Sequence, residues 1–447
     1  MNMKKRILSV VAVVLCTAAA VVYGTGSVQS AGQTQSAQDA ERIFTPKKET
    51  IYFWYTDENL TSFLNGAAVS FGEQRGVRVI PVLTSDEEYL EAINRASLHT
   101  EQIPDVYLLD SSNLEKAYLA GLASETKDAG SICNAWNFPD SAIHAVTYQG
   151  KNIAYPFYFD TSVLLYNKSY LDQWGEQQDA KREAQPEEEL MSPEEQERLQ
   201  NAEYATLDEL LYVANTFDVP ENVEGVMKWD VADIFYNYWF AGRYLIVGGE
   251  DGDNREQIDI NNPEAVQCLK TYQLLNQFFS METDTIKYES VMQDFIEGKI
   301  MFTVVTSDAA KRMEKALEEG AFAYEYDFAV MPEISEELDS ASLAVTNCVV
   351  VNGYSGEKEL ANEFAAYLVG DYAEGLYDRT GKMPAKLGTN AEQKAVQVFR
   401  QEYADSVALP KMMETGNFWM QMEVLFAKVW NGEDVESLLG ALAEQME

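Results

Sequence analysis

The chain has few of the residues on which most enzymes and metal proteins rely. Among its 447 residues there are two histidines, His99 and His144, and four cysteines without CxxC spacing. Scarce histidine limits the usual general bases, and cysteines without a histidine cluster argue against a zinc site and a disulfide framework. The sequence also lacks a GxSxG elbow, an HExxH motif and a Walker loop. We therefore expect no catalytic residue, no metal and no cofactor.

Basic residues are scarce as well. The sequence has 33 Lys and Arg against 73 Asp and Glu, a formal net charge of −40. A surface this acidic repels nucleic acid and anionic lipid, so both are excluded as partners. We interpret the acidity as a means of keeping an exported protein soluble, with a specific role in cation binding as the alternative. Because paired carboxylates can also hydrolyse glycosides, a secreted carboxylate-dependent glycosidase stays open.

A long apolar run lies at the N-terminus. Three basic residues at positions 4–6 precede apolar residues 7–23, the arrangement of an export signal. Cleavage after Ser30, lipid attachment at Cys16 and retention as an anchor are all open, and each places the protein outside the cytoplasmic membrane. We therefore interpret residues 1–30 as an export signal or N-terminal membrane anchor. Residues 31–48, rich in Ser, Gln, Gly and Ala, are interpreted as a flexible tether.

Strand and helix patterns alternate from residue 50 onward, and the chain is long enough for two lobes with separate cores. The predicted order is strand 50–55, helix 59–74, strand 77–83, helix 87–97 and strand 105–109. This β-α-β-α-β order indicates a parallel sheet flanked by helices. In such sheets ligands gather beyond the carboxyl ends of the strands.

The second half of the chain continues the alternation after an acidic interruption. Residues 172–205 are rich in Glu, Gln, Lys and Arg, which favours a solvated helical excursion, with a partner-docking face as the alternative. Thr206 is a predicted N-cap, with Glu209 in the capping-box position. Another helix begins at Asn262 and Pro263. The remaining predicted elements are strands 300–305, 328–331 and 345–351 and helices 357–369 and 421–429.

Polar residues follow several of these strands. Asp57, Asp110, Asp160 and Asp308 lie at predicted strand ends or in a crossover, and Ser111 follows Asp110. Their oxygens could accept hydrogen bonds from sugar hydroxyls; the alternative is that they cap helices or sit in solvated turns. We favour a binding role most strongly for Asp160, because it falls within the predicted crossover.

Aromatic residues form the second candidate element. The apolar face of a pyranose ring stacks on flat aromatic side chains, although most such rings fill protein cores. Trp239 and Trp419 are favoured because small or polar residues adjoin them. The complete set of predicted binding residues is Tyr55, Asp57, Asp110, Ser111, Tyr158, Asp160, Tyr236, Trp239, Asp308 and Trp419.

One segment indicates a family. YPFYFDTSVLLYNKSYL, residues 155–171, closely resembles the first interlobe crossing of the family-1 extracellular sugar-binding proteins of ABC importers. The resemblance runs from about residue 50 to the C-terminus and is broken mainly by the acidic excursion. Further similar segments, in the same order and spacing, are IPDVYLLDSSNLEKAYLAGL (103–122), IDINNPEAVQCLKTYQLLNQFFS (258–280), FIEGKIMFTVV (295–305) and GEDVESLLGALAEQM (432–446).

This resemblance implies a two-lobe α/β fold of the periplasmic-binding-protein type (type II), with a ligand cleft between the lobes. Three interlobe crossovers are expected near residues 159–162, 342–346 and 376–383. Lobe 1 would comprise residues 49–159 and 346–377. Lobe 2 would comprise residues 163–342 and 383–447.

The resemblance also implies a function. The chain would be an extracytoplasmic, monomeric receptor that captures a carbohydrate and delivers it to the permease of an ABC importer, touching the membrane only through its N-terminal segment. Another polar solute, such as a peptide or polyamine, is the alternative. Asp160 matches an acidic hydroxyl-binding position, Tyr236 lies near an aromatic one, and Trp419 matches a stacking tryptophan. Residues 306–308 are Thr-Ser-Asp where many relatives have Gly-Pro-Trp, so the sugar class is left open.

Overall fold

The computed structural model describes residues 49–447 apart from 100–101, 128, 185–190, 280, 282–285, 414–415 and 447. The predicted export signal, the tether and Cys16 lie outside the described residues. None of the helices in the described part of the chain combines the length and apolar character needed to span a bilayer.

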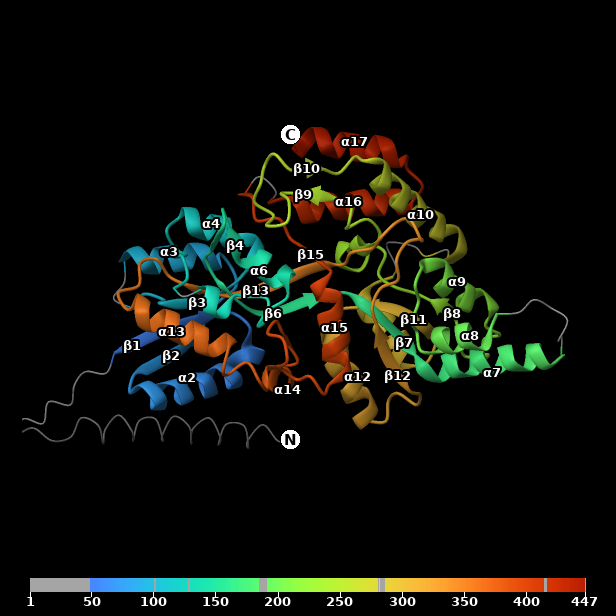
Figure 1. Cartoon of the computed structure of the whole chain (residues 1–447), viewed down its shortest axis with the longest axis horizontal. Helices are drawn as coiled ribbons and strands as arrows, with labels where there is room; N and C mark the ends of the chain where they lie inside the picture. The colour runs from blue at the N-terminus through green and yellow to red at the C-terminus, as the bar shows by residue number, and fades with distance from the viewer. Residues whose placement is uncertain are drawn as a thin grey trace, which may run out of the picture. The chain divides into compact units, whose positions relative to one another are not determined.

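The larger sheet has seven strands and forms the base of lobe 1 (Figure 1). Its order is β14-β6-β13-β3-β1-β2, with β15 paired to β13. The strands are β1 (Thr50–Tyr55), β2 (Arg78–Leu83), β3 (Val106–Asp110), β6 (Tyr155–Thr161), β13 (Leu343–Val351), β14 (Met383–Pro384) and β15 (Val407–Ala408). β1 pairs in parallel with β2 and β3, which confirms the expected parallel start, whereas β13 runs antiparallel to β3 and β6.

Lobe 2 is built on a four-stranded sheet of order β12-β7-β11-β8. Its strands are β7 (Val163–Asn167), β8 (Gly225–Met227), β11 (Ile300–Val305) and β12 (Tyr326–Ala329). β7 and β11 are buried along their whole length, as continuous apolar runs in a covered sheet should be. Two short hairpins accompany the sheets, β4 (Thr147–Tyr148) with β5 (Lys151–Asn152) and β9 (Ile246–Val247) with β10 (Ile258–Asp259).

Helices cover both faces of the lobe 1 sheet (Figure 1). Alternate residues of β3 explain this: Val106 and Leu108 pack in one core cluster with α2 and α13, while Tyr107 and Leu109 pack in another with α3 and α4. The lobe 1 helices are α2 (Thr61–Arg75), α3 (Tyr89–His99), α4 (Leu114–Leu119), α5 (Ala129–Ile132), α6 (Asp140–Val146), α13 (Lys358–Val369) and α14 (Leu376–Thr380). The predicted helix and strand boundaries in residues 50–110 are thus confirmed to within two residues.

The other helices pack mainly on lobe 2, except α15, which packs against strands of both sheets. They are α7 (Lys168–Ala184), α8 (Pro193–Gln200), α9 (Leu207–Thr216), α10 (Pro263–Phe279), α11 (Tyr288–Ile296), α12 (Asp308–Glu318), α15 (Lys394–Ala404), α16 (Phe418–Trp430) and α17 (Val435–Met446). The 3-10 turns in the described residues are η1 (Glu58–Leu60), η2 (Ser111–Asn113), η3 (Ile234–Tyr236) and η4 (Tyr238–Phe240). Pro263 opens α10, as predicted, since a first-turn position needs no backbone N–H partner.

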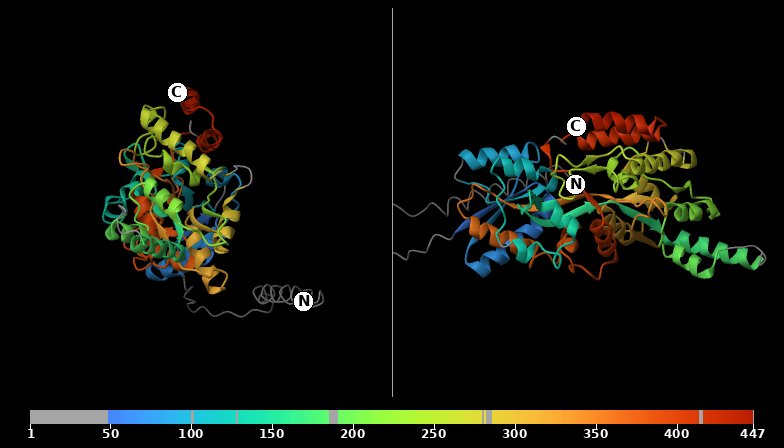
Figure 2. Two further views of the ribbon diagram at one scale, coloured as in Figure 1. Left: turned by 90° about the vertical axis from the view of Figure 1, so that its right-hand side faces the viewer. Right: turned by 45° about the horizontal axis from the view of Figure 1, so that its top comes forward.

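The described residues of the acidic excursion lie mainly in helices α7 and α8, as expected, and these helices project from lobe 2 (Figure 2). The predicted capping box is wrong. Thr206 stands at the N-cap of α9 but its side chain makes no capping bond. Glu209 instead accepts the N–H of Ala205 at 2.6 Å and pairs with Arg198 at 2.5 Å. The guanidinium of Arg198 in α8 is a charged partner for the Glu209 carboxylate, and the sequence pattern did not predict this pair.

Two of the three expected crossovers are confirmed. Only Ser162 separates β6 in one sheet from β7 in the other, and β13 begins directly after Ser342. The third crossover, expected near residues 376–383, stays a prediction. β14 and β15 pair with strands of the lobe 1 sheet, and α16 joins the lobe 2 core. Two-residue strands leave no periodic signal in a sequence, which is why these two pairings were not predicted.

Candidate functional site

Asp160 connects the two lobes directly. It lies near the end of β6, and its Oδ1 accepts the backbone N–H of Ser307, which follows β11 in lobe 2, at 2.9 Å. Burial raises the pKa of Asp160 to about 6. Hydrogen bonds from Ser307 oppose this rise, the charge of Asp308 adds to it and Lys382 offsets part of it. A carboxyl group is therefore held at the junction of the lobes, close to three groups from other elements.

A second carboxylate, Asp57, lies on the lobe 1 side of this junction. It caps η1 by accepting the N–H of Asn59 at 2.9 Å, and its Oδ2 is 2.7 Å from Nζ of Lys382. Burial would raise the pKa of Asp57, but the hydrogen bond and charge of Lys382, together with Asn59, outweigh it and lower the pKa. The same ammonium lies 5.4 Å from the ring centroid of Tyr158.

Tyr158 lies at the centre of the acidic group. Burial raises the pKa of its hydroxyl, and the charges of Asp57, Asp160 and Asp110 raise it further. The charges of all three predicted aspartates of lobe 1 therefore act on one tyrosine. That arrangement places carboxylate oxygens at the ends of three different strands on the same edge of the sheet.

Asp110 and Ser111 occupy the turn after β3. Asp110 accepts the N–H of Ser112 at 3.1 Å and the side-chain amide of Asn113 at 2.8 Å, so both its oxygens stabilise the turn. Ser111 is fully buried, and its hydroxyl has no hydrogen-bond partner among the described residues. Asp110 thus combines the capping role with a position beside Tyr158.

Lobe 2 contributes an aromatic row made of Trp419, Phe235, Tyr236 and Tyr288. Trp419 stacks on Phe235 with centroids 5.7 Å apart and planes at 23°. Phe235 meets Tyr236 edge-on at 6.4 Å, and Tyr236 stacks on Tyr288 at 4.9 Å and 19°. These rings come from α16, η3 and α11, three elements far apart in sequence.

Asp308 stands at one end of the aromatic row, as the first residue of α12. Its Oδ1 accepts the hydroxyls of Tyr288 at 2.8 Å and Thr306 at 2.6 Å, and its Oδ2 is 3.2 Å from Arg312. Burial raises the pKa of Tyr236, with further contributions from the charges of Asp308 and Asp160. The aromatic row therefore lies beside the interlobe carboxylate Asp160.

A pocket of about 480 Å³ adjoins these groups, and we call it the Trp419 pocket. One wall is η2 together with Lys116 of α4, and the other is the segment that leads into α16. Its lining residues are Ser112, Asn113, Lys116, residues 409–413, Gly416, Phe418 and Trp419. Residues of both lobes therefore face a common space next to Asp110 and the aromatic row.

Two predicted residues lie elsewhere. Tyr55 is 2% exposed in the lobe 1 core, and its hydroxyl donates to Thr61 Oγ1 at 3.0 Å. Trp239 is completely buried in the lobe 2 core, and its ring centroid lies 3.8 Å from that of Phe240. Asn237, the polar neighbour that favoured Trp239, instead accepts the indole N–H of Trp229 at 2.8 Å. Both side chains fill cores, the alternative that the sequence left open.

The structure also places residues in the site that the sequence did not single out. Lys382, Ser307 and Tyr288 contact predicted residues directly, and Phe235 joins the aromatic row. Phe235 belongs to the aromatic stretch 235–240 and could have been found there. Lys382 lies within residues 376–383, where the third crossover was expected, but its side chain was not selected as a candidate. In the part of the chain that the structure describes, no group of three or more His, Cys, Asp or Glu side chains could hold a metal ion.

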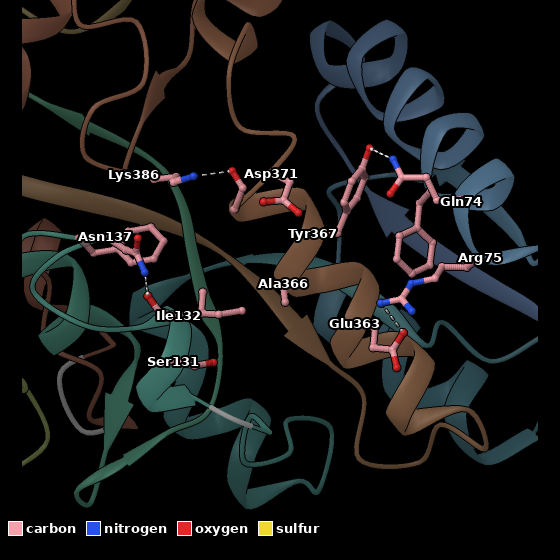
Figure 3. A pocket seen from close by; sticks show the side chains of 13 residues that line it. Gln74, Arg75, Ser131, Ile132, Asn137, Glu363, Ala366, Tyr367, Asp371 and Lys386 are labelled. Atoms are coloured by element: carbon pink, nitrogen blue, oxygen red, sulfur yellow. Dashed lines mark hydrogen bonds and ion pairs between the residues drawn. The ribbon is translucent and has the colours of Figure 1, made fainter.

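A separate pocket of about 420 Å³ lies wholly within lobe 1, between α2, α13 and the α5 region (Figure 3). Its polar side chains bind one another or nearby backbone. Arg75 pairs with Glu363 at 3.2 Å, and Lys386 donates to the carbonyl of Gly370 at 2.8 Å. None of the predicted binding residues lines this lobe 1 pocket.

Fold and site together define a two-lobe α/β binding protein with a polar and aromatic junction between its lobes. Residues 77–374 match the sequence model of the bacterial extracellular solute-binding protein family, and the chain belongs to this family. Its members bind solutes outside the cytoplasm, which agrees with the extracytoplasmic location expected from the sequence.

Individual relatives agree with this assignment. The maltodextrin-binding protein MdxE of Bacillus subtilis is 22% identical over 418 residues, covering 90% of this chain and 89% of that protein. The structure is similar to an extracellular solute-binding protein from Staphylococcus aureus in complex with maltose, with a TM-score of 0.73, 18% identity and coverage of 90% and 97%. A cyclo/maltodextrin-binding protein complexed with maltotetraose gives a TM-score of 0.72 at 20% identity, with the same coverage. These similarities confirm the two-lobe fold.

Proposed function

We propose that this chain captures a carbohydrate outside the cytoplasm and delivers it, unchanged, to the permease of an ABC importer. The observation that carries the proposal is the meeting of two kinds of surface at one junction. Asp57 and Asp160 supply acceptors from lobe 1, and the aromatic row supplies flat rings from lobe 2. Sugars need both, because their C–H faces stack on rings while their hydroxyls need hydrogen-bond partners.

The names of the relatives suggest which sugars to test first. MdxE is named for maltodextrin, and the two structures are described with maltose and maltotetraose. In this chain, Thr306, Ser307 and Asp308 form a polar wall with hydroxyl and carboxylate groups. We therefore propose a short α-glucan or a related oligosaccharide that makes more hydrogen bonds at this wall than stacking contacts.

The cellular setting belongs to the same proposal. We infer a monomer that is held to the membrane, or released, according to the fate of residues 1–48. Lobe 1 would comprise 49–159 and 346–377, joined by the short strands β14 and β15, and lobe 2 would comprise 163–342 and the C-terminal helices α16 and α17. Closure of these lobes over the solute would present it to the permease.

A cationic solute such as a polyamine is the second candidate. It is favoured by the excess of carboxylates at the junction, where Asp57, Asp160 and Asp308 outnumber Lys382 and Arg312, and by Glu423, which accepts the indole N–H of Trp419 at 2.8 Å. Acidic groups beside rings would suit an ammonium ion as well as a hydroxyl.

Titration calorimetry on the exported form tests these proposals. Maltose, maltotriose, maltotetraose, spermidine and a mixed tripeptide would be added in turn. Saturable heat with a maltodextrin supports the carbohydrate receptor, and saturable heat with spermidine alone supports the second candidate. Incubation with maltotetraose, followed by chromatography of the sugar, separates a receptor from a glycosidase: shorter products would overturn the binding function.

A further inference from the structure

Lys411 is a buried lysine that lies between the two lobes. It stands in the segment between β15 and α16, and it is only 1% exposed. Its Nζ donates to the carbonyl of His144 in α6 at 2.9 Å and also to the carbonyl of Asp251. The first carbonyl belongs to lobe 1 and the second to the loop between β9 and β10. One ammonium group therefore satisfies its hydrogen bonds only when both carbonyls lie next to it.

The β9–β10 loop, residues 248–257, belongs to lobe 2, since Val247 at its base packs in the lobe 2 core. Gly252 in this loop has φ +64, and a Cβ there would lie 3.2 Å from Cα of Pro410. Glycine thus allows the loop to approach the segment before Lys411 closely. The backbone N–H of Lys411 donates to the Gly252 carbonyl at 2.8 Å.

The same loop is held against lobe 1 by side chains. Asp251 Oδ1 lies 2.7 Å from Nδ1 of His144, and Asp253 accepts the backbone N–H of Gln149 at 2.6 Å. Glu250 lies 3.9 Å from the other ring nitrogen of His144. We call these contacts, together with those of Lys411, the interlobe clasp. The interlobe clasp joins α6 of lobe 1 to the β9–β10 loop of lobe 2, two elements that are not part of the crossover strands.

The interlobe clasp adjoins the candidate site. Residues 409–413 form one wall of the Trp419 pocket. On its other side, the same segment borders a pocket of about 520 Å³ that α6 and the β9–β10 loop also line. The wall is fixed to lobe 1 at a second point, where the N–H of Met413 donates to the buried carboxylate of Glu115 at 2.5 Å. Movement of the β9–β10 loop away from α6 would therefore remove one of the two attachments of the wall that faces Trp419 to lobe 1.

We propose that Lys411 is a positioning residue for the solute site, which fixes the wall beside Trp419 by holding the β9–β10 loop of lobe 2 against α6 of lobe 1. A buried ammonium that loses either carbonyl must find water or another acceptor, so its contacts favour the arrangement in which the two elements touch. The effect on solute affinity rests on the proposed function. The effect on the distance between the lobes does not.

Lys411→Met in the full chain tests the proposal, because methionine keeps most of the buried volume while removing the donors. Spin labels at the exposed positions Leu119 in lobe 1 and Leu274 in lobe 2 report the interlobe distance by pulsed electron resonance. In the ligand-free protein, we expect Lys411→Met to shift the distance distribution or broaden it by several ångströms. Lys386→Met is the matched control, since Lys386 also donates to a backbone carbonyl but stays within lobe 1 (Figure 3).

Affinity for maltotriose gives a second readout. The dissociation constant should rise about tenfold in Lys411→Met and stay unchanged in Lys386→Met, because a less populated binding-competent state weakens apparent affinity in proportion. An interlobe distance identical to that of the parent protein would overturn the proposal, whatever the affinity. If no solute in the screen binds, the proposed function fails, but the distance measurement still decides the role of Lys411.

A second variant guards against a folding defect. Asp253→Ala removes a partly exposed acceptor from the interlobe clasp and leaves Lys411 in place. We expect a smaller change in the interlobe distance, in the same direction. If Lys411→Met does not fold, an unchanged distance in Asp253→Ala would overturn the proposal, and a changed one would support it.

Discussion

The candidate site and the lobe 1 pocket contain similar side chains but differ in where their partners come from. In the lobe 1 pocket, Arg75 and Glu363 pair across α2 and α13 of one lobe, and both are about half exposed, at 55% and 49%. In the candidate site, Asp160 of β6 in lobe 1 accepts the backbone N–H of Ser307 in lobe 2 at 2.9 Å. The comparison teaches that charge and aromatic content do not distinguish a site from a surface hollow. The contribution of side chains from both lobes distinguishes a site, because only side chains at the junction of the lobes change their surroundings when the lobes move.

The largest expected effect comes from the aromatic row. Trp419→Ala removes the ring that stacks on Phe235 and lines the Trp419 pocket. We expect the dissociation constant for maltotriose, measured by calorimetry, to rise about 30-fold, roughly 2 kcal/mol. Trp136→Ala is the control, because that ring is 91% exposed and outside the site. Equal losses in both variants would contradict the assignment of Trp419.

The next effect is on stability and has a definite pH dependence. The pKa of Asp160 is raised by burial to about 6, from a model-compound value of 3.8, so the folded state holds the proton more tightly. This contribution to stability is complete below pH 4 and is lost as the pH rises through 6. Asp160→Asn should therefore raise the free energy of unfolding at pH 7.5 by about 1–2 kcal/mol, after allowance for partial solvent screening.

Thermal unfolding at several pH values checks this expectation. The midpoint of Asp160→Asn should exceed that of the parent protein at pH 7.5, and the difference should vanish near pH 4. Glu402 adds the same pH dependence to the unfolding midpoint of both proteins. Burial raises the pKa of Glu402 to about 7, although Ser342 and the N–H of Met331 donate hydrogen bonds to it. A midpoint difference that is independent of pH would show that Asp160 does not titrate in this range.

A smaller effect is expected at Asp57. Its pKa is lowered by Lys382 despite burial, so its contribution to stability is present above pH 3.8 and is lost as the pH falls through the lower folded value. Asp57→Ala should cost about 1 kcal/mol at pH 7 in urea unfolding, because it removes a partly buried ion pair and a turn cap. Glu125→Ala breaks the more exposed pair with Lys151 and serves as the comparison. If both cost the same, Asp57 is an ordinary surface charge.

The smallest effect belongs to the lobe 1 pocket. Arg75→Ala removes a pair whose two members are about half exposed, so we expect a change in unfolding free energy of about 0.5 kcal/mol or less. Maltotriose affinity should not change. A marked loss of affinity in this variant would show that the lobe 1 pocket takes part in binding, and the contrast between the two regions would fail.

The capping role of the polar residues, which the sequence analysis gave as the alternative to binding, follows from local sequence, whereas the surroundings of the aromatic rings do not. Asp57 and Asp110 are held by N–H groups of the next three residues, so a strand followed by a short turn is enough to place them. Rings such as Tyr55 and Trp239 have no local signal that distinguishes a core from a cleft. Both lie in cores, and so do Phe235 and Tyr236, which together with Tyr288 and Trp419 form the aromatic row.

The sequence by itself determined the alternation of strands and helices, the first two crossovers, the family and the carboxylates that end the lobe 1 strands. These depend on periodicity, local capping and ordered motifs, which a chain carries in neighbouring residues. Only the tertiary structure decided that Lys382 meets Asp57, that β14 and β15 extend the lobe 1 sheet, and that Lys411 joins α6 to the β9–β10 loop. Such pairings depend on how far-separated segments pack, and the free energy that selects them belongs to no single stretch of the chain.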